Sequence, residues 1–143
     1  MSKIRFRYLP HTADIRFVSY GNTFKEAFEN AVRALLNVML DIKRISRENS
    51  KVGSINIKES ARTKEDLVWY TLQDILSKVD EKSLKAFDFK IINIDEAELK
   101  LSGKLFFKNT DKDYSLLEVK AITPHELKVE KTRMWSIHVL VDV

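Results

Sequence analysis

Cysteine is absent from the 143 residues of this chain, which also contains only three glycines and two prolines. Without cysteine the protein can form no disulfide, no thiolate metal site and no covalent cysteine intermediate. The three glycines, Gly21, Gly53 and Gly103, stand far apart, so the chain has no glycine-rich loop that could surround a phosphate. These absences exclude thiol-based catalysis and phosphate binding of the P-loop type.

Long apolar runs are missing as well. No run approaches the ~20 residues that a bilayer-spanning helix requires. The first seven residues alternate charged with apolar side chains and lack the apolar core of a secretory signal peptide. Hydrophobic residues make up 44% of the chain and charged residues 32%, which is typical of a globular protein. We therefore expect a single domain, residues 1–143, in a cytoplasmic protein that has no contact with a membrane.

No block of one charge sign stands out. The 25 Lys and Arg residues are interspersed with 21 Asp and Glu residues, which leaves a net charge of +4. A nucleic-acid-binding protein usually concentrates its basic residues on one face. Four basic residues could still form a strip that contacts RNA or an acidic protein surface: Lys3, Arg5, Arg7 and Arg16. A solvent-exposed sheet face explains them better, and direct RNA contact stays an open question.

Two helices carry clear start signals. Thr23 with Glu26, and Thr63 with Asp66, match the pattern in which a threonine side chain caps a helix N-terminus. After each threonine, apolar residues recur with the 3.6-residue period of a helix that buries one face. The first helix is expected to end near Asp41.

Most of the remaining chain shows the alternating or β-branched pattern of strands. Expected strands cover residues 4–8, 15–20, 87–94, 99–107, 116–122, 126–130 and 135–141, with a loop or strand at 52–57. We predict an α+β fold with two layers, in which two long helices pack on a mostly antiparallel, mixed β-sheet.

Carboxylates are expected to gather where the last strand ends. Asp142 and Val143 follow that strand, while Asp14 precedes the strand at 15–20. If the two strands are neighbours, both aspartates and the α-carboxylate of Val143 share one small volume, where like charges favour a bound cation. Such oxygen ligands suit calcium, magnesium or manganese rather than zinc. Taken alone, each aspartate is better explained as a solvated residue at a strand end.

Four sequence blocks form a distinctive combination that runs almost from end to end. They are Tyr8-Leu9-Pro10-His11-Thr12-Ala13-Asp14-Ile15, then Gly21 to Phe28, then Lys120 to Thr123 with His125, and finally Trp135 with Val141-Asp142-Val143. Together these blocks resemble the archease family. The resemblance matches the essential acidic pair of that family to Asp14 and Asp142. It also favours a site role for Lys120, which would otherwise be taken for a solvated strand lysine.

Further residues in these blocks have two interpretations each. His11 could bind metal, transfer protons or hydrogen-bond a carboxylate, and it could equally be a structural histidine at a bend. Thr12 suits a capping role better than a nucleophilic one, because no base lies beside it in sequence. His125 follows Pro124, at a position where archeases often carry an aromatic residue, so the local backbone there is expected to differ.

The resemblance implies a protein cofactor rather than a stand-alone enzyme. Archeases assist the RtcB-type RNA ligase, which uses GTP to join exons in tRNA splicing, by promoting guanylylation of the ligase and its multiple turnover. A divalent metal, with calcium as first choice, would then sit at the carboxylates. Three alternatives are a chaperone-like modulator of a tRNA methyltransferase, a small metal-dependent phosphoester hydrolase, and plain RNA binding. The hydrolase is disfavoured because two-metal phosphotransfer needs more carboxylates and histidines than this cluster offers.

Overall fold

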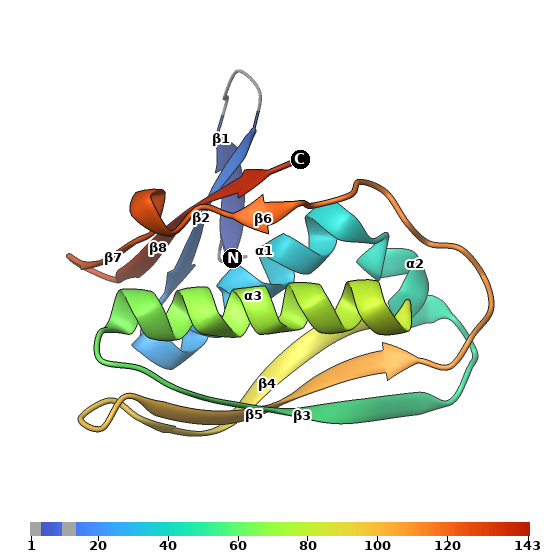
Figure 1. The fold of residues 1–143 in the computed structure, drawn as a ribbon, viewed down its shortest axis with the longest axis horizontal. Coiled ribbons are helices and arrows are strands. Elements are labelled where there is room, and N and C mark those ends of the chain that lie inside the picture. The colour runs from blue at the N-terminus through green and yellow to red at the C-terminus, as the bar shows by residue number, and fades with distance from the viewer. Residues whose placement is uncertain (1–3, 10–13) are drawn as a thin grey trace.

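A computed structural model describes residues 4–9 and 14–143 of the chain (Figure 1). Its strands are β1 (Phe6–Leu9), β2 (Ile15–Gly21), β3 (Val52–Ser60), β4 (Lys85–Asp95), β5 (Lys100–Lys108), β6 (Ala121–Ile122), β7 (Lys128–Lys131) and β8 (Trp135–Asp142). Its helices are α1 (Phe24–Met39), α2 (Ile42–Arg47) and α3 (Lys64–Lys82), with a 3-10 turn at Pro124–Glu126. The α+β class predicted from the sequence is therefore confirmed, with α1 and α3 as the two main helices.

Both main helices begin as their capping signals predict. The Thr23 hydroxyl accepts a hydrogen bond from the Glu26 N–H at 3.0 Å, and Thr63 accepts one from the Asp66 N–H at 3.0 Å. Helix α1 ends at Met39, and the side chain of Asp41 then caps the short helix α2, which the sequence did not predict.

The strands form two sheets, whereas a single mixed sheet was expected. One sheet has the order β1-β2-β8-β6, with β7 also paired to β8, and the other has the order β3-β5-β4. Each pairing between described strands is antiparallel. Helix α1 contacts β2 and β8 of the first sheet and β4 of the second, so the helices lie between the sheets (Figure 1). Eleven of the sixteen residues of α1 are buried, which is too wide an apolar surface for one sheet to cover.

The core lies where the two sheets meet the helices. Its largest fully buried side chains include Phe17 on β2, Phe28 and Leu35 on α1, Leu72 on α3 and Leu105 on β5. No helix in the described part of the chain is both long and apolar enough to cross a membrane.

The segment from Asn109 to Lys120 corrects one expectation. A strand was predicted over residues 116–122, but only Ala121–Ile122 is a strand. Before it, the backbone is held by separate hydrogen bonds, such as the one from the Leu116 N–H to the Met39 carbonyl at 2.8 Å. Apolar residues alone do not make a strand, because a strand needs a continuous partner for its backbone. Similarly, the strand predicted at 126–130 begins at Lys128, after the 3-10 turn.

Candidate functional site

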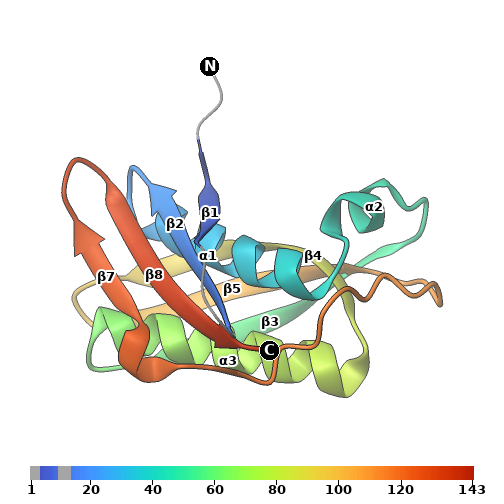
Figure 2. The same cartoon turned by 90° about the horizontal axis from the view of Figure 1, so that it is seen from above.

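The register of β2 and β8 places Asp14 and Asp142 at the same end of the sheet. Ile15 pairs with Val141 in this antiparallel register. Asp14, just before Ile15, and Asp142, just after Val141, therefore come to the same end of the two strands. β8 is also flanked by β6 and β7, and Figure 2 shows it between β2 and β7. We call Asp14, Asp142 and Val143 the carboxylate tip. Asp14 directly precedes β2, and Asp142 is the last residue of β8.

Lys120 reaches the carboxylate tip from the other side of β8. Its backbone N–H donates to the Asp142 carbonyl at 2.7 Å, and the Thr123 N–H donates to the Leu140 carbonyl at 3.0 Å. Between these bonds, Ala121 pairs directly with Asp142. The sheet therefore brings Lys120 next to Asp142, as the sequence blocks suggested, although its role remains a prediction.

His125 lies within the described residues, whereas the N-terminal candidates do not. His125 is exposed on the 3-10 turn, beside Glu126, which forms an ion pair with Arg16 at 3.0 Å. His11 and Thr12 lie outside the described residues, so their predicted roles remain predictions.

The donor atoms at the carboxylate tip are all oxygens. Asp142 is exposed, while Asp14 and Val143 are half-buried. Within residues 4–9 and 14–143, no group of three or more His, Asp or Glu side chains is placed to hold a metal ion. Oxygen donors of this kind are those that a hard cation prefers, so metal binding by the two aspartates and Val143 stays a prediction. The described side chains at the tip do not form a closed metal site on their own.

Trp69 is a supporting residue that the sequence did not reveal. Its indole N–H donates to the Ile122 carbonyl at 2.7 Å. This bond ties β6 to α3, and β6 in turn places Ala121, with Lys120 just before it, beside Asp142. A tryptophan next to the apolar stripe of a helix was the only signal available, and it does not identify the acceptor.

Tyr8 holds β1 against α1, on the side of the sheet order opposite to β6. Its hydroxyl donates to the Ala34 carbonyl at 2.9 Å and accepts from the Asn37 amide at 3.2 Å. Burial raises the pKa of Tyr8, which keeps the hydroxyl protonated as a donor. Tyr8 and Asn37 also line a groove of about 430 Å³ that includes Asp14 and Leu117. The carboxylate tip is therefore bordered by an apolar surface.

The possible basic strip is only partly formed. In the β1–β2 register Leu9 lies opposite Arg16 and Arg7 lies opposite Val18, so Arg7 and Arg16 share one face of the sheet. Arg16 is already paired with Glu126. Lys3 lies outside the described residues. Arg5 and Arg7 are exposed, so direct RNA contact stays an open question.

Comparison with known proteins decides the family. The sequence model of the archease protein family matches residues 6–143. This chain belongs to the archease family. It is 33% identical to the archease of Methanosarcina acetivorans, an alignment that covers 97% of this chain and 96% of the relative. It is 31% identical to the archease of Pyrococcus furiosus, over 97% of this chain and 99% of that protein.

Solved structures support the fold. The solution structure of protein 1598 from Methanobacterium thermoautotrophicum superposes with a TM-score of 0.71 at 24% identity, over 97% of this chain and 99% of that one. The crystal structure of an archease from Thermotoga maritima, described as a possible chaperone, gives a TM-score of 0.66 at 21% identity. That match covers 100% of this chain and 98% of that one, so the two chains share their fold.

Proposed function

We propose that this protein activates a GTP-dependent RNA ligase of the RtcB type in tRNA splicing. It would promote guanylylation of the ligase and its multiple turnover without catalysing a reaction of its own. Membership of the archease family supports this function, and one structural observation carries it. The β2–β8 register places Asp14 and Asp142, which match the family's essential acidic pair, at one accessible end of the sheet.

The carboxylate tip would hold a divalent cation, calcium in the first place and magnesium or manganese as alternatives. Asp14 and Asp142 supply negative oxygen ligands, and Val143 supplies a third oxygen. A bound cation would supply positive charge near the phosphates of GTP. Lys120, held next to Asp142 by its own backbone, would balance the carboxylates or contact an acidic group of the ligase.

The chemistry of the nucleotide would remain with the ligase. The described residues provide a pair of carboxylates but no cluster of three side chains that could bind a metal on their own. An incomplete coordination sphere suits a protein that completes its site against a partner. For the same reason we propose a cofactor rather than a metal-dependent hydrolase.

The test is ligase guanylylation and product formation, measured with and without this protein. With limiting ligase, we expect faster formation of the guanylylated ligase and more than one joined RNA per ligase molecule. The isolated protein should release no product from GTP or RNA. An unchanged ligase with a cognate partner would refute the proposal.

A chaperone-like modulator of a tRNA-modifying enzyme, such as a methyltransferase, is the second candidate. The Thermotoga maritima relative is described as a possible chaperone, which is the observation that favours it. It predicts that this protein lowers methyltransferase aggregation, measured by light scattering, and leaves ligase guanylylation unchanged. The ligase assay therefore separates the two candidates.

A further inference from the structure

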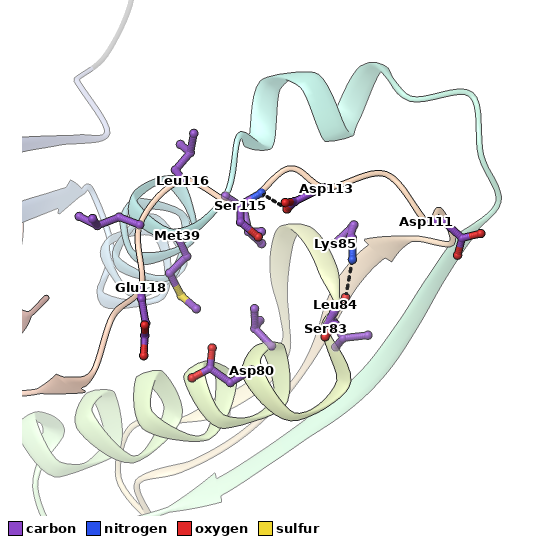
Figure 3. Close-up of a pocket in the computed structure, with 13 residues that line it drawn as sticks. Met39, Asp80, Ser83, Leu84, Lys85, Asp111, Asp113, Ser115, Leu116 and Glu118 are labelled. Atoms are coloured by element: carbon purple, nitrogen blue, oxygen red, sulfur yellow. Dashed lines mark hydrogen bonds between the residues drawn. The ribbon is translucent and has the colours of Figure 1, made fainter.

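A second groove lies beyond Leu117, away from the carboxylate tip. The ends of α1 and α3 and the segment 111–118 enclose a volume of about 380 Å³ (Figure 3). Its floor is apolar and includes Met39 and Val79, both nearly inaccessible to solvent. The carboxylate tip does not contribute to this groove, so the proposed metal site leaves its purpose unexplained.

The rim of the groove is strongly acidic. Four carboxylates line it against one amine, that of Lys85: Asp80, Asp111, Asp113 and Glu118. Within the described ranges, none of these carboxylates forms an ion pair. Figure 3 shows Asp80 on α3 and Glu118 on the facing segment, with both side chains directed to the same side of the groove. Partial burial and the charge of Glu118 raise the pKa of Asp80, whereas hydrogen bonds from Ser115 and the charge of Lys85 lower the pKa of Asp113.

Two leucines stand exposed along this rim. Leu116 is 59% exposed and Leu117 is 44% exposed, which is unusual for adjacent leucines in an ordered segment. They are held in place, because the Leu116 N–H donates to the Met39 carbonyl at 2.8 Å. Leu117 also lines the groove that contains Asp14. The apolar rim therefore connects the acidic groove to the carboxylate tip.

We propose that this acidic groove docks a segment of a partner protein in which lysine or arginine side chains alternate with aliphatic ones. Cationic groups would pair with Asp80 and Glu118 and relieve their mutual repulsion. Aliphatic side chains would cover Leu116, Leu117 and the apolar floor. RNA is a poor occupant, because its phosphates would be repelled by the same carboxylates.

The identity of the partner rests on the proposed function. The chemistry of the docked segment rests on the groove alone. If the protein activates an RNA ligase, the ligase supplies the docked segment. The groove would then contribute affinity, while the carboxylate tip, across Leu117, would contribute activation. Separate surfaces for the two tasks make their loss separable by mutation.

The first test uses a synthetic probe. An end-capped Lys-Leu-Lys-Leu-Lys peptide is titrated into the isotopically labelled protein, and amide shifts are followed by NMR. We expect shifts that cluster at Leu84, Ser115 and Leu117, and none with a Glu-Leu-Glu-Leu-Glu peptide. The double variant Asp80→Lys, Glu118→Lys should bind the basic peptide roughly tenfold more weakly, since two attractive charge pairs become repulsive.

A matched control changes the net charge by the same amount at positions outside the groove. The variant Glu65→Lys, Glu98→Lys should bind the basic peptide like the native chain. If the double groove variant is not folded by circular dichroism, Leu116→Ser replaces it and should also weaken binding, because Leu116 is exposed. Scattered shifts, or equal binding of both peptides, would overturn the proposal.

The second test links the groove to the ligase. The groove variant should bind immobilised ligase at least roughly tenfold more weakly, yet reach native guanylylation when its concentration is raised to saturation. Asp142→Asn should do the reverse, with native binding and no activation. A groove variant that binds the ligase normally would overturn docking at this groove. If the native chain fails to activate the ligase, the proposed function is wrong. The peptide titration alone then decides whether the groove binds a basic segment.

Discussion

At the residue scale, Asp142 has two separable tasks. Its backbone carbonyl accepts the Lys120 N–H and so joins β6 to β8, while its side chain is exposed and would bind the cation that we propose. The sequence placed both Asp14 and Asp142 at strand ends from the pattern of nearby apolar residues. It could not establish that the strands are neighbours, because pairing depends on residues more than 100 positions apart.

Glu59 on β3 provides a pH-dependent test of its half-buried contact with Asp74. Burial, a hydrogen bond with Asp74 and the charge of Asp74 raise the pKa of Glu59 to about 8 from 4.5. The folded protein therefore holds this proton more tightly than the unfolded chain. Its contribution to stability is fully present below pH 4.5 and is lost as the pH rises towards about 8.

Glu59→Gln removes this titration and keeps the shape of the side chain. We expect the variant to gain stability relative to the native protein as the pH rises from 4.5 to 8, and to show no further relative gain above that. Urea unfolding at several pH values measures this difference. A difference that stays constant across the range would contradict the assignment, and Glu98→Gln in the exposed β4–β5 turn is the matched control.

At the scale of elements, local signals predicted the helices better than the strands. Thr23 and Thr63 cap α1 and α3 through bonds to residues three positions away, so sequence neighbours determine them. β6 is different, because its two residues are a strand only through β8, while the indole of Trp69 holds its outer carbonyl. Its predicted extension back to Leu116 was wrong for this reason.

Trp69→Phe tests whether α3 positions β6. The change keeps an aromatic ring but leaves the Ile122 carbonyl without its donor, which should cost about 1–2 kcal/mol of stability. Hydrogen exchange at the Lys120 and Thr123 amides should accelerate, because both donate across the β6–β8 pair. Tyr70→Phe, in the neighbouring exposed position, should change neither quantity. Unchanged exchange in Trp69→Phe would show that β8 alone holds β6.

At the scale of the whole molecule, the helices lie between two antiparallel sheets. The sequence predicted the α+β class from element types, but the number of sheets depends on how much of each helix is buried on both sides. The acidic groove could not be predicted from the sequence either, since its carboxylates come from α3 and from a segment with no regular structure. A surface assembled from distant segments can be recognised only once the fold is known.

In the function that we propose, the carboxylate tip activates a ligase that binds elsewhere on the protein. The most direct measurement is the single-turnover rate of ligase guanylylation at saturating Asp142→Asn, compared with the native chain and with Glu98→Gln. Asparagine preserves the backbone bond to Lys120, so stability should change by no more than about 0.5 kcal/mol. We predict that Asp142→Asn leaves the rate at that of the ligase alone, while Glu98→Gln gives the native rate. A native rate with folded, ligase-bound Asp142→Asn would show that the carboxylate of Asp142 is not needed for activation.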